Sequence, residues 1–271
     1  MGKGNRLRLP VTAGGSGTPL LRYPLVKAFK MRNLRTVALL SQLCISAVAS
    51  AMPPVAKTGA QGELIHHFDF AGEESLPARA WLESQDFLLK QHATHSDKID
   101  LYHAEGALHV RAKEAAFGSI LHELDINGVN YVRMHWGVST CPAGASYEHG
   151  IDNEAIMVYV FFGDAKIPSG SIFIPDSPYF IGFFLCPPGS DNIEQPYVGH
   201  HYKKSGRYIC VDHPPPGATI VTELDLAQEF IKSFGRQEVP AVSGISVEVD
   251  TTDSGNDGKA AAFLKRIEFL R

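Results

Sequence analysis

The sequence predicts a mainly β protein, an antiparallel β-sandwich of jelly-roll type with one short helix. Three observations favour this fold class. Roughly ten short segments alternate apolar and polar residues with a period of two. Each segment is bounded by Gly, Pro, Asn or Asp, the residues typical of turns. The alternation of strand and helix that marks a parallel sheet is not seen in the pattern.

The predicted strands follow one another along most of the chain. The clearest is 131–138, where Val132, Met134 and Trp136 alternate with polar residues, so one face is expected in the core. The predicted strands are residues 63–70, 108–111, 131–138, 155–162, 170–174, 179–185, 207–211, 245–250 and 263–270.

One helix is predicted between residues 222 and 235. Thr222 and Asp225 resemble a capping box, apolar residues recur every four positions up to Phe234, and Gly235 is a typical stop.

The segment 31–51 predicts a cleavable secretory signal peptide. Arg32 and Arg35 precede an uncharged apolar run, which ends in the small residues Ala49 and Ala51 on either side of a serine. The run is shorter than the roughly 20 apolar residues that a membrane span needs. We therefore expect an exported bacterial protein, periplasmic or secreted, that is not an integral membrane protein after cleavage.

This prediction sets the domain boundaries. Residues 1–30 are a basic, Gly/Pro-rich extension upstream of Met31, which we interpret as the true initiator. Residues 52–62 form a linker, and 63–271 form a single domain, long enough for a sizeable core.

The charge of the predicted mature protein excludes some partners. Residues 1–51 hold eight of the 25 Lys and Arg residues and none of the 29 Asp and Glu residues, which leaves 17 basic groups and a formal charge of −12. Such a body repels polyphosphates and anionic lipid surfaces, so nucleic-acid binding is not expected.

Three cysteines remain beyond the signal peptide. Cys186 and Cys210 lie in or next to predicted strands and are the candidate disulfide, with Cys141 left over in a loop. Three unpaired thiols remain the alternative.

Several stretches carry a resemblance to known proteins. The terminal strands 67–70 and 263–270 look like the paired end strands of galactose-binding-like sandwiches, a fold common among carbohydrate-binding modules. The stretches 131–136, 153–162 and 244–251, with the predicted helix, resemble an uncharacterised bacterial family of exported proteins, a domain of unknown function. The resemblance spans about residues 63–271 and implies a scaffold without known catalytic residues.

A candidate ligand-binding trio lies on the polar face of the strand 131–138. Tyr131, Arg133 and His135 point to one side, with neighbours about 7 Å apart. Arginine can clamp a carboxylate, while tyrosine and histidine supply hydrogen bonds or proton transfer. The alternative is a solvated outer face.

Aromatic residues and histidines supply the other binding candidates. Aromatic faces stack on sugar rings, and Pro-flanked loops hold them rigid. Adjacent strand residues point to opposite sides, so two neighbouring histidines can serve one site only in a loop. The candidates are Tyr179, Tyr197, His200, His201 and Tyr202.

Metal sites have weaker signals. The resemblance implies a structural Ca²⁺ near the terminal strands, for which Asp69, Glu73, Glu74 and Glu268 offer hard oxygen ligands. The loop 253–258 fails the EF-hand pattern, and a hairpin turn explains its composition equally well. No spacing supports a transition-metal site, and no other cofactor is indicated.

Catalysis has little support in the sequence. No G-x-S-x-G elbow, phosphate-binding loop or dinucleotide fingerprint is present. Glu148, Asp152 and Glu154 lie close together, but such acidic loops are usually solvated, and the separation that glycoside hydrolysis needs is not visible in sequence.

The leading hypothesis is a non-catalytic exported module that binds a saccharide or similar envelope ligand. One alternative is a glycan-active enzyme of polysaccharide-lyase type, using Tyr131, Arg133 and His135 or the pair His200 and His201. Another is an envelope assembly factor that binds protein.

Overall fold

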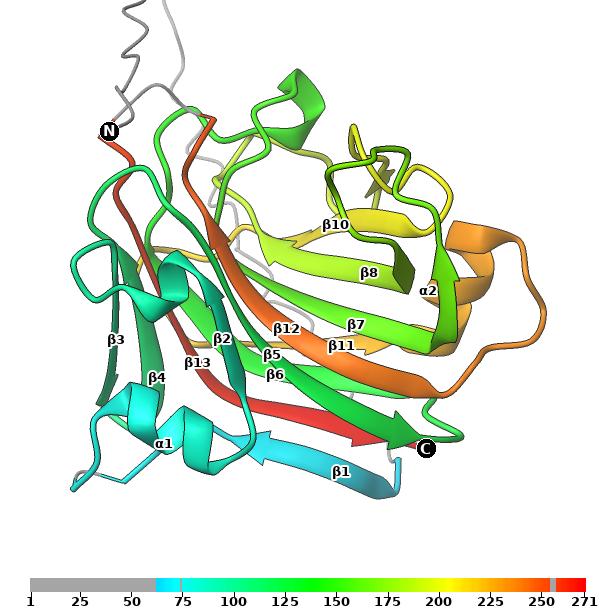
Figure 1. Ribbon diagram of the computed structural model, residues 1–271, viewed down its shortest axis with the longest axis horizontal. Helices are drawn as coiled ribbons and strands as arrows, with labels where there is room; N and C mark the ends of the chain where they lie inside the picture. Colours follow the sequence, from blue (N-terminus) through cyan, green and yellow to red (C-terminus); the bar gives the residue numbers. More distant parts are fainter. Residues whose placement is uncertain (1–61, 74, 254–256) are drawn as a thin grey trace, which may run out of the picture. The chain divides into compact units, whose positions relative to one another are not determined.

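Two β-sheets packed face to face make up the computed structural model, which describes residues 62–73, 75–253 and 257–271 (Figure 1). The expectations for the extension 1–30, the signal peptide 31–51 and nearly all of the linker lie outside these residues. The prediction of a mainly β sandwich is confirmed, since strands form both layers and nearly all neighbouring strands are antiparallel.

Sheet A has the strand order β11–β6–β13–β4–β3, with β1 added beside β13. Its strands are β1 (Leu64–Asp69), β3 (Ile99–Ala104), β4 (Ala107–Ala112), β6 (Tyr131–Thr140), β11 (Ile220–Asp225) and β13 (Ala260–Leu270). The two ends of the domain pair as the sequence predicts, with Phe68 opposite Ile267.

Sheet B has the strand order β2–β5–β12–β7–β8–β10–β9. Figure 1 shows β5, β12, β7 and β8 side by side. Its strands are β2 (Leu88–Gln91), β5 (Phe117–Ile126), β7 (Glu154–Ile167), β8 (Ser177–Leu185), β9 (Pro196–Tyr197), β10 (Gly206–Asp212) and β12 (Val242–Asp250). The pair β8–β10 is parallel. A parallel pair needs a crossover connection, and the segment between Leu185 and Gly206 supplies it.

The core lies between the sheets, on the faces that the period-two pattern predicts. Val132, Met134 and Trp136 of β6 are all 0% exposed. From sheet B, Ile245 and Val247 of β12 are buried in the same cluster. A period of two places alternate side chains on opposite faces, so the other residues of these strands point outward.

The predicted helix forms as α2 (Leu226–Phe234), but its cap differs from the prediction. Thr222 lies in β11, where its hydroxyl accepts a hydrogen bond from the buried Trp136 Nε1 at 2.9 Å. Asp225 caps the helix instead, accepting from the Gln228 N–H at 2.9 Å. The need to satisfy a buried indole N–H therefore outweighs the local capping pattern.

A second helix, α1 (Ala78–Ser84), is not predicted by the sequence analysis. It begins after Pro77 without a side-chain cap, and it buries Trp81 and Leu82. A helix of 7 residues is too short to be stable by propensity, so burial of these side chains stabilises it. Two 3₁₀ turns, η1 (His92–Thr94) and η2 (Tyr147–His149), complete the elements. Neither α1 nor α2 is long and apolar enough to cross a membrane.

The predicted strand 170–174 is wrong. These residues lie in the loop between β7 and β8, which turns at Gly170 with φ +88°. The Ser169 hydroxyl donates to the Ile174 carbonyl at 2.7 Å and holds the loop together. Ile172 and Phe173 are 93% and 89% exposed, so these two apolar side chains do not pack in a sheet.

A candidate ligand-binding groove on sheet B

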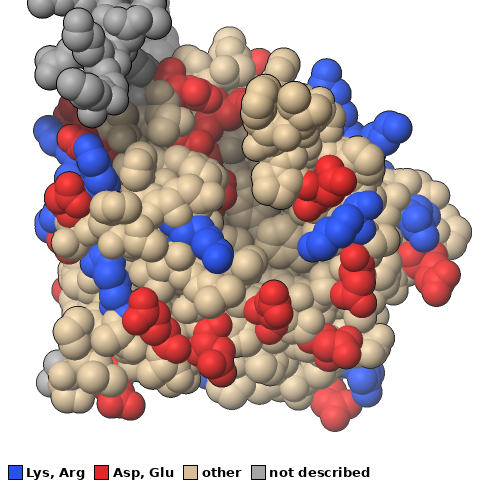
Figure 2. All heavy atoms as spheres, in the orientation of Figure 1, with Lys and Arg blue, Asp and Glu red and all other residues tan. Residues whose placement is uncertain are grey.

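A groove of about 570 Å³ opens on the outer face of sheet B. Figure 2 shows this face hollowed, with acidic side chains crowded at the upper edge of the hollow. Strands β5, β12, β7, β8 and β10 supply the floor, and loops between strands supply the rim. The lining residues that matter below are Tyr147, Asp152, Glu154, Tyr159, Phe180, His200, His201, Tyr202, Tyr208, Glu248 and Asp250.

Aromatic rings form a cluster on this outer face, separate from the core between the sheets. Tyr159 of β7, Phe180 of β8 and Tyr208 of β10 contact one another, with ring centroids 5.4 to 6.2 Å apart. Gly206 leaves room for this cluster, since a Cβ there would lie 2.5 Å from Phe180 Cζ. A side chain at position 206 would displace the ring, so the glycine lets it lie against the sheet.

A β-bulge brings Glu154 into the groove. On strand β12, Glu248 lies opposite Met157 and Asp250 opposite Glu154, so two residues of β12 match three of β7. The extra residue of a bulge changes which side of the strand the following side chains face. Glu154, Tyr159 and Glu248 therefore all line the same groove.

Glu154 is buried at the groove floor, with 2% of its surface exposed. Its Oε2 accepts a hydrogen bond from the Tyr147 hydroxyl at 2.7 Å. Its Oε1 is buried and has no hydrogen-bond partner among the described residues. The sequence pattern favours a solvated acidic loop for this carboxyl, and that prediction is wrong because Glu154 is buried at the start of β7.

Glu248 lies on the neighbouring strand β12 and, like Glu154, accepts a hydrogen bond from a tyrosine hydroxyl. Its Oε1 accepts from the Tyr159 hydroxyl at 2.5 Å, between residues 89 positions apart in sequence. Asp250, two residues on, accepts instead from the Thr252 N–H at 2.8 Å. Glu154 and Glu248 thus each accept a hydrogen bond from one tyrosine hydroxyl in the groove.

The electrostatics of the groove favour protonated acids. Burial raises the pKa of Glu154 well above its usual range, and the carboxyls of Glu248 and Asp250 raise it further. Burial also raises the pKa of Glu248 to about 8, against the hydrogen bond from Tyr159. Among the described lining residues there are five carboxyls and one lysine, so little positive charge offsets them.

Two loops form the rim over Tyr147 and are fastened together. Ser146 caps η2, and its hydroxyl donates to the Ser190 carbonyl at 2.8 Å. Asp191 accepts from the Glu148 N–H at 2.8 Å. Ser146 and Asp191 are both buried. The loop before β7 and the loop after β8 therefore hold the Tyr147 ring above Glu154.

The predicted candidates His200, His201 and Tyr202 all line the groove. They lie in a loop, which is the condition for both histidines to serve one site, and their rings stand 4.8 Å apart. Tyr202 has φ +55°, a left-handed conformation that costs energy for a side chain of this size. Its N–H donates to the Ser169 carbonyl and its hydroxyl to the Pro175 carbonyl, both at 2.9 Å, which holds it in place.

Cys186 and Cys210 are joined by a disulfide. The bridge spans 24 positions and encloses the segment with β9, His200, His201 and Tyr202. His213 lies with the two sulfurs in the one compact set of potential metal ligands among the described residues. Thiolates are needed to bind a metal, and disulfide sulfurs do not supply them. Cys141 is a free cysteine.

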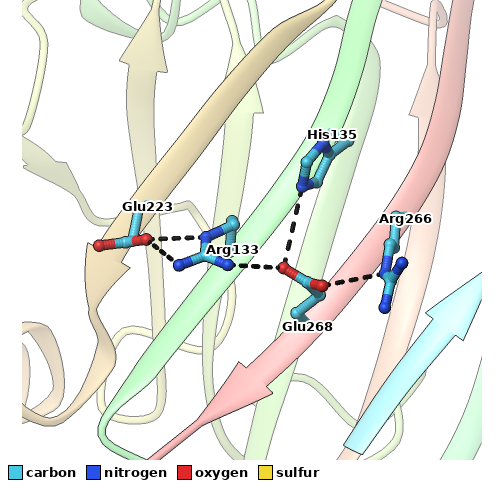
Figure 3. Close-up of polar contacts among 5 residues, drawn as sticks. All are labelled: Arg133, His135, Glu223, Arg266 and Glu268. Carbon is cyan, nitrogen blue, oxygen red and sulfur yellow. Dashed lines mark hydrogen bonds and ion pairs between the residues drawn. The ribbon is translucent and has the colours of Figure 1, made fainter. Parts of the chain in front are cut away.

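The trio Tyr131, Arg133 and His135 lies elsewhere, on the outer face of sheet A. Figure 3 shows Arg133 and His135 with their partners. Arg133 lies between Glu223 of β11 and Glu268 of β13, with nitrogen–oxygen distances of 2.7 and 3.0 Å. Hydrogen bonding to Glu223 raises the pKa of Arg133. The guanidinium is thus held in a cross-strand network of the sheet, and the structure does not bring the trio to the groove.

The two other predicted tyrosines lie outside the groove lining. Tyr179 packs on the far side of β8 against Phe230 and Phe234 of α2, with centroids 5.7 and 4.7 Å away. The Tyr197 hydroxyl accepts from the Asn192 N–H at 2.9 Å, and its ring lies 6.1 Å from that of Tyr147. Tyr197 therefore contacts the rim residue Tyr147 without lining the groove itself.

The candidate calcium ligands do not converge among the described residues. Asp69 accepts from the Ala71 N–H at 3.0 Å. The two oxygens of Glu268 face Arg133 and Arg266, each at 3.0 Å. Glu73 is exposed and does not join them in a set of potential metal ligands. Glu74 lies outside the described residues. A carboxylate that already neutralises two guanidinium groups is a poor calcium ligand.

Six of these lining residues were not identified from the sequence: Tyr147, Tyr159, Phe180, Tyr208, Glu248 and Asp250. One signal was present. Ser246, Glu248 and Asp250 alternate with the apolar residues of β12, which places two carboxyls on the outward face of a central strand. A solvated outer face and a groove floor share this pattern, so the pattern by itself does not separate them.

The described residues thus form a two-sheet β-sandwich with an acidic, tyrosine-lined groove on one outer face. No protein-family model and no curated protein matches the chain.

Solved structures are similar at low identity. One is the low-affinity xylan-binding module CBM86 from the gut symbiont Roseburia intestinalis, at 11% identity, covering 68% of this chain and 96% of that one, with a TM-score of 0.28. Another is the winged bean acidic lectin complexed with methyl-α-D-galactose, at 9% identity, covering 76% and 99%, with a TM-score of 0.35. At these TM-scores the likeness carries no argument about the ligand of this chain.

Proposed function

We propose that the groove on sheet B binds a neutral saccharide. The observation that supports this most is the pairing of tyrosine rings with carboxyls along one open groove of about 570 Å³. Tyrosine faces stack on the apolar faces of sugar rings, and carboxyls accept hydrogen bonds from sugar hydroxyls. A groove of this volume falls within the range of small-ligand sites.

The charge of the groove favours a neutral saccharide over an acidic one. The single lysine in the lining cannot neutralise a chain of uronates, and any of the five carboxyls that is ionised repels one. A lyase acting on uronate polymers also needs a cation beside the substrate carboxylate, and Arg133 is engaged by Glu223 and Glu268 on the other sheet. A neutral glycan is therefore favoured over an acidic one.

A binding experiment with matched variants tests the proposal. The full chain is run in affinity gels that contain xylan, mixed-linkage β-glucan or galactomannan, and in gels with polygalacturonate or alginate. We expect retardation by at least one neutral polymer and by neither acidic one. Absence of retardation by every neutral polymer would overturn the proposal.

Tyr208→Ala removes a ring from the groove, and Tyr102→Ala removes a 37% exposed ring from β3 of sheet A as a control. The loss of one stacked ring is worth about 1.4 kcal/mol, or tenfold in affinity. We expect this loss for Tyr208→Ala alone.

The proposal includes export to the periplasm or the medium, as the signal peptide predicted at 31–51 implies. N-terminal sequencing of the natural product is the test. A first residue near Met52 supports export with cleavage, and a mature chain that retains residues 2–30 contradicts it.

A further inference from the structure

The groove has a feature that saccharide binding alone does not require. A carboxyl that only accepts hydrogen bonds from sugar hydroxyls works well when it is half-exposed and ionised. Glu154 is instead 2% exposed, has no cation among the causes of its pKa shift, and keeps one oxygen without a partner in the described part of the chain. Burying a carboxyl in this way is costly unless it carries a proton.

The contacts of Glu154 specify where that proton lies. The Tyr147 hydroxyl donates to Oε2 and so occupies that oxygen as an acceptor. Oε1 is left as the atom that can carry a proton and donate it. Oε1 is itself buried, but Glu154 lines the groove, so a group bound there becomes the acceptor once the carboxyl turns toward it.

Glu248 supplies a second carboxyl on the strand beside Glu154, in the same groove. Glu154 lies opposite Asp250, so Glu248 is its diagonal neighbour on the adjacent strand. Diagonal neighbours on one face lie about 7–8 Å apart. From these strand positions two glutamate side chains can extend over one groove with a sugar bond and a water between their carboxyl groups.

We propose that Glu154 and Glu248 hydrolyse a glycosidic bond of the saccharide in the groove, with Glu154 as general acid and Glu248 as general base. The proposal rests on the proposed function, since the bond must first be bound between them.

The reaction consumes one water. Glu154 Oε1 gives its proton to the glycosidic oxygen as the bond from that oxygen to the anomeric carbon breaks. A water oxygen bonds to the anomeric carbon from the opposite face, and Glu248 takes the proton which that water loses. The products are two sugar chains that each gain a hydroxyl, and return of the proton from Glu248 to Glu154 restores the pair.

The groups around the pair agree with these roles. Tyr147, Tyr159, Tyr208, Asp250 and Asp152 face the two carboxyls, with His200 beside Asp152. The tyrosines have pKa values raised by burial and stay neutral. Close carboxyls cannot readily ionise together, so the pair releases its protons in two steps. Glu248 releases its proton first, as pH rises toward about 8, and Glu154, the more buried, keeps its own, so the rate of hydrolysis should increase toward pH 8.

The test measures hydrolysis and binding on the same samples. The full chain is incubated with the neutral polysaccharides, new reducing ends are counted, and affinity gels report binding. Glu154→Gln and Glu248→Gln keep the acceptor for each tyrosine, and Glu238→Gln changes an exposed glutamate outside the groove as the matched control. General acid–base catalysis is worth roughly 10²–10⁴-fold. We expect each groove variant to lose at least 100-fold in rate while binding changes less than about threefold.

The outcomes separate the two proposals. Binding without new reducing ends overturns hydrolysis and leaves the proposed function standing, whereas absence of binding overturns both. Groove variants as fast as the wild type also overturn hydrolysis. Should Glu154→Gln fail to fold, Glu248→Gln decides, because Glu248 is less deeply buried than Glu154. Proton NMR of the first product should show an inverted anomer, and a retained anomer would refute the role of Glu248 as base.

Discussion

The raised pKa of Glu248 predicts that the protein loses stability as pH rises. Burial raises this pKa from 4.5 to about 8. Between these values the native state keeps a proton that the unfolded chain has released. Stability is therefore greatest below pH 4.5 with respect to this group, and it is lost as pH rises toward 8.

The magnitude follows from the width of that window. One retained proton gives a slope of about 1.4 kcal/mol per pH unit, so Glu248 alone contributes at most about 5 kcal/mol between pH 4.5 and 8. The raised pKa values of Glu154 and Asp250 act in the same direction. Tyr159 and Tyr208 face Glu248 and remain neutral throughout, so they do not offset the slope.

Urea unfolding at pH 5, 6, 7 and 8, followed by tryptophan fluorescence, measures this slope. Glu248→Gln removes the titrating group and should make the loss between pH 5 and 8 smaller by a few kcal/mol, so the variant is more stable than the wild type at pH 8. Glu238→Gln should keep the wild-type slope. Unfolding free energy that is constant or rises over this range, or an unchanged slope in Glu248→Gln, would refute the reasoning.

Three further predictions concern the scaffold. Replacing Cys186 and Cys210 by alanine opens a loop of 24 positions, which should cost about 3 kcal/mol in urea unfolding and weaken saccharide binding; an unchanged midpoint contradicts this. Glu268→Gln leaves Arg133 without one of its carboxylates and should cost about 1–2 kcal/mol, with affinity-gel retardation unchanged, whereas lost retardation would implicate sheet A in binding. Gly206→Val places a Cβ 2.5 Å from the Phe180 ring, so retardation should fall, and wild-type retardation would show that the ring has room to move.

The fold class could be predicted because it depends on local pattern. In β6, the alternation of Val132, Met134 and Trp136 with polar residues predicts a strand with one buried face, and all three are fully buried. The pattern was less informative for short elements. The helix α1 has no polar cap, and the apolar residues Ile172 and Phe173 lie in an exposed loop.

The binding candidates were only partly predictable. The aromatic and histidine residues His200, His201 and Tyr202 were identified from composition, and they line the groove. Arg133 has equally suitable chemistry, but Glu223 and Glu268 engage it from strands 90 and 135 positions away in sequence. Whether a polar side chain is already hydrogen-bonded within the protein depends on residues far away in the sequence, so it cannot be predicted from local pattern.

The sequence by itself determined which residues alternate in most strands and which cysteines could pair, because turn chemistry and a period of two are local properties. The strands β2, β3, β5, β9 and β11 were not predicted. The sequence also predicts export through residues 31–51, which lie outside the described structure. Only the tertiary structure decided that the groove lies on sheet B. The bulge at Glu154, the pairing of Tyr159 with Glu248 and the loops held by Ser146 each join residues distant in the chain. The burial that raises the carboxyl pKa values exists only once those segments have met.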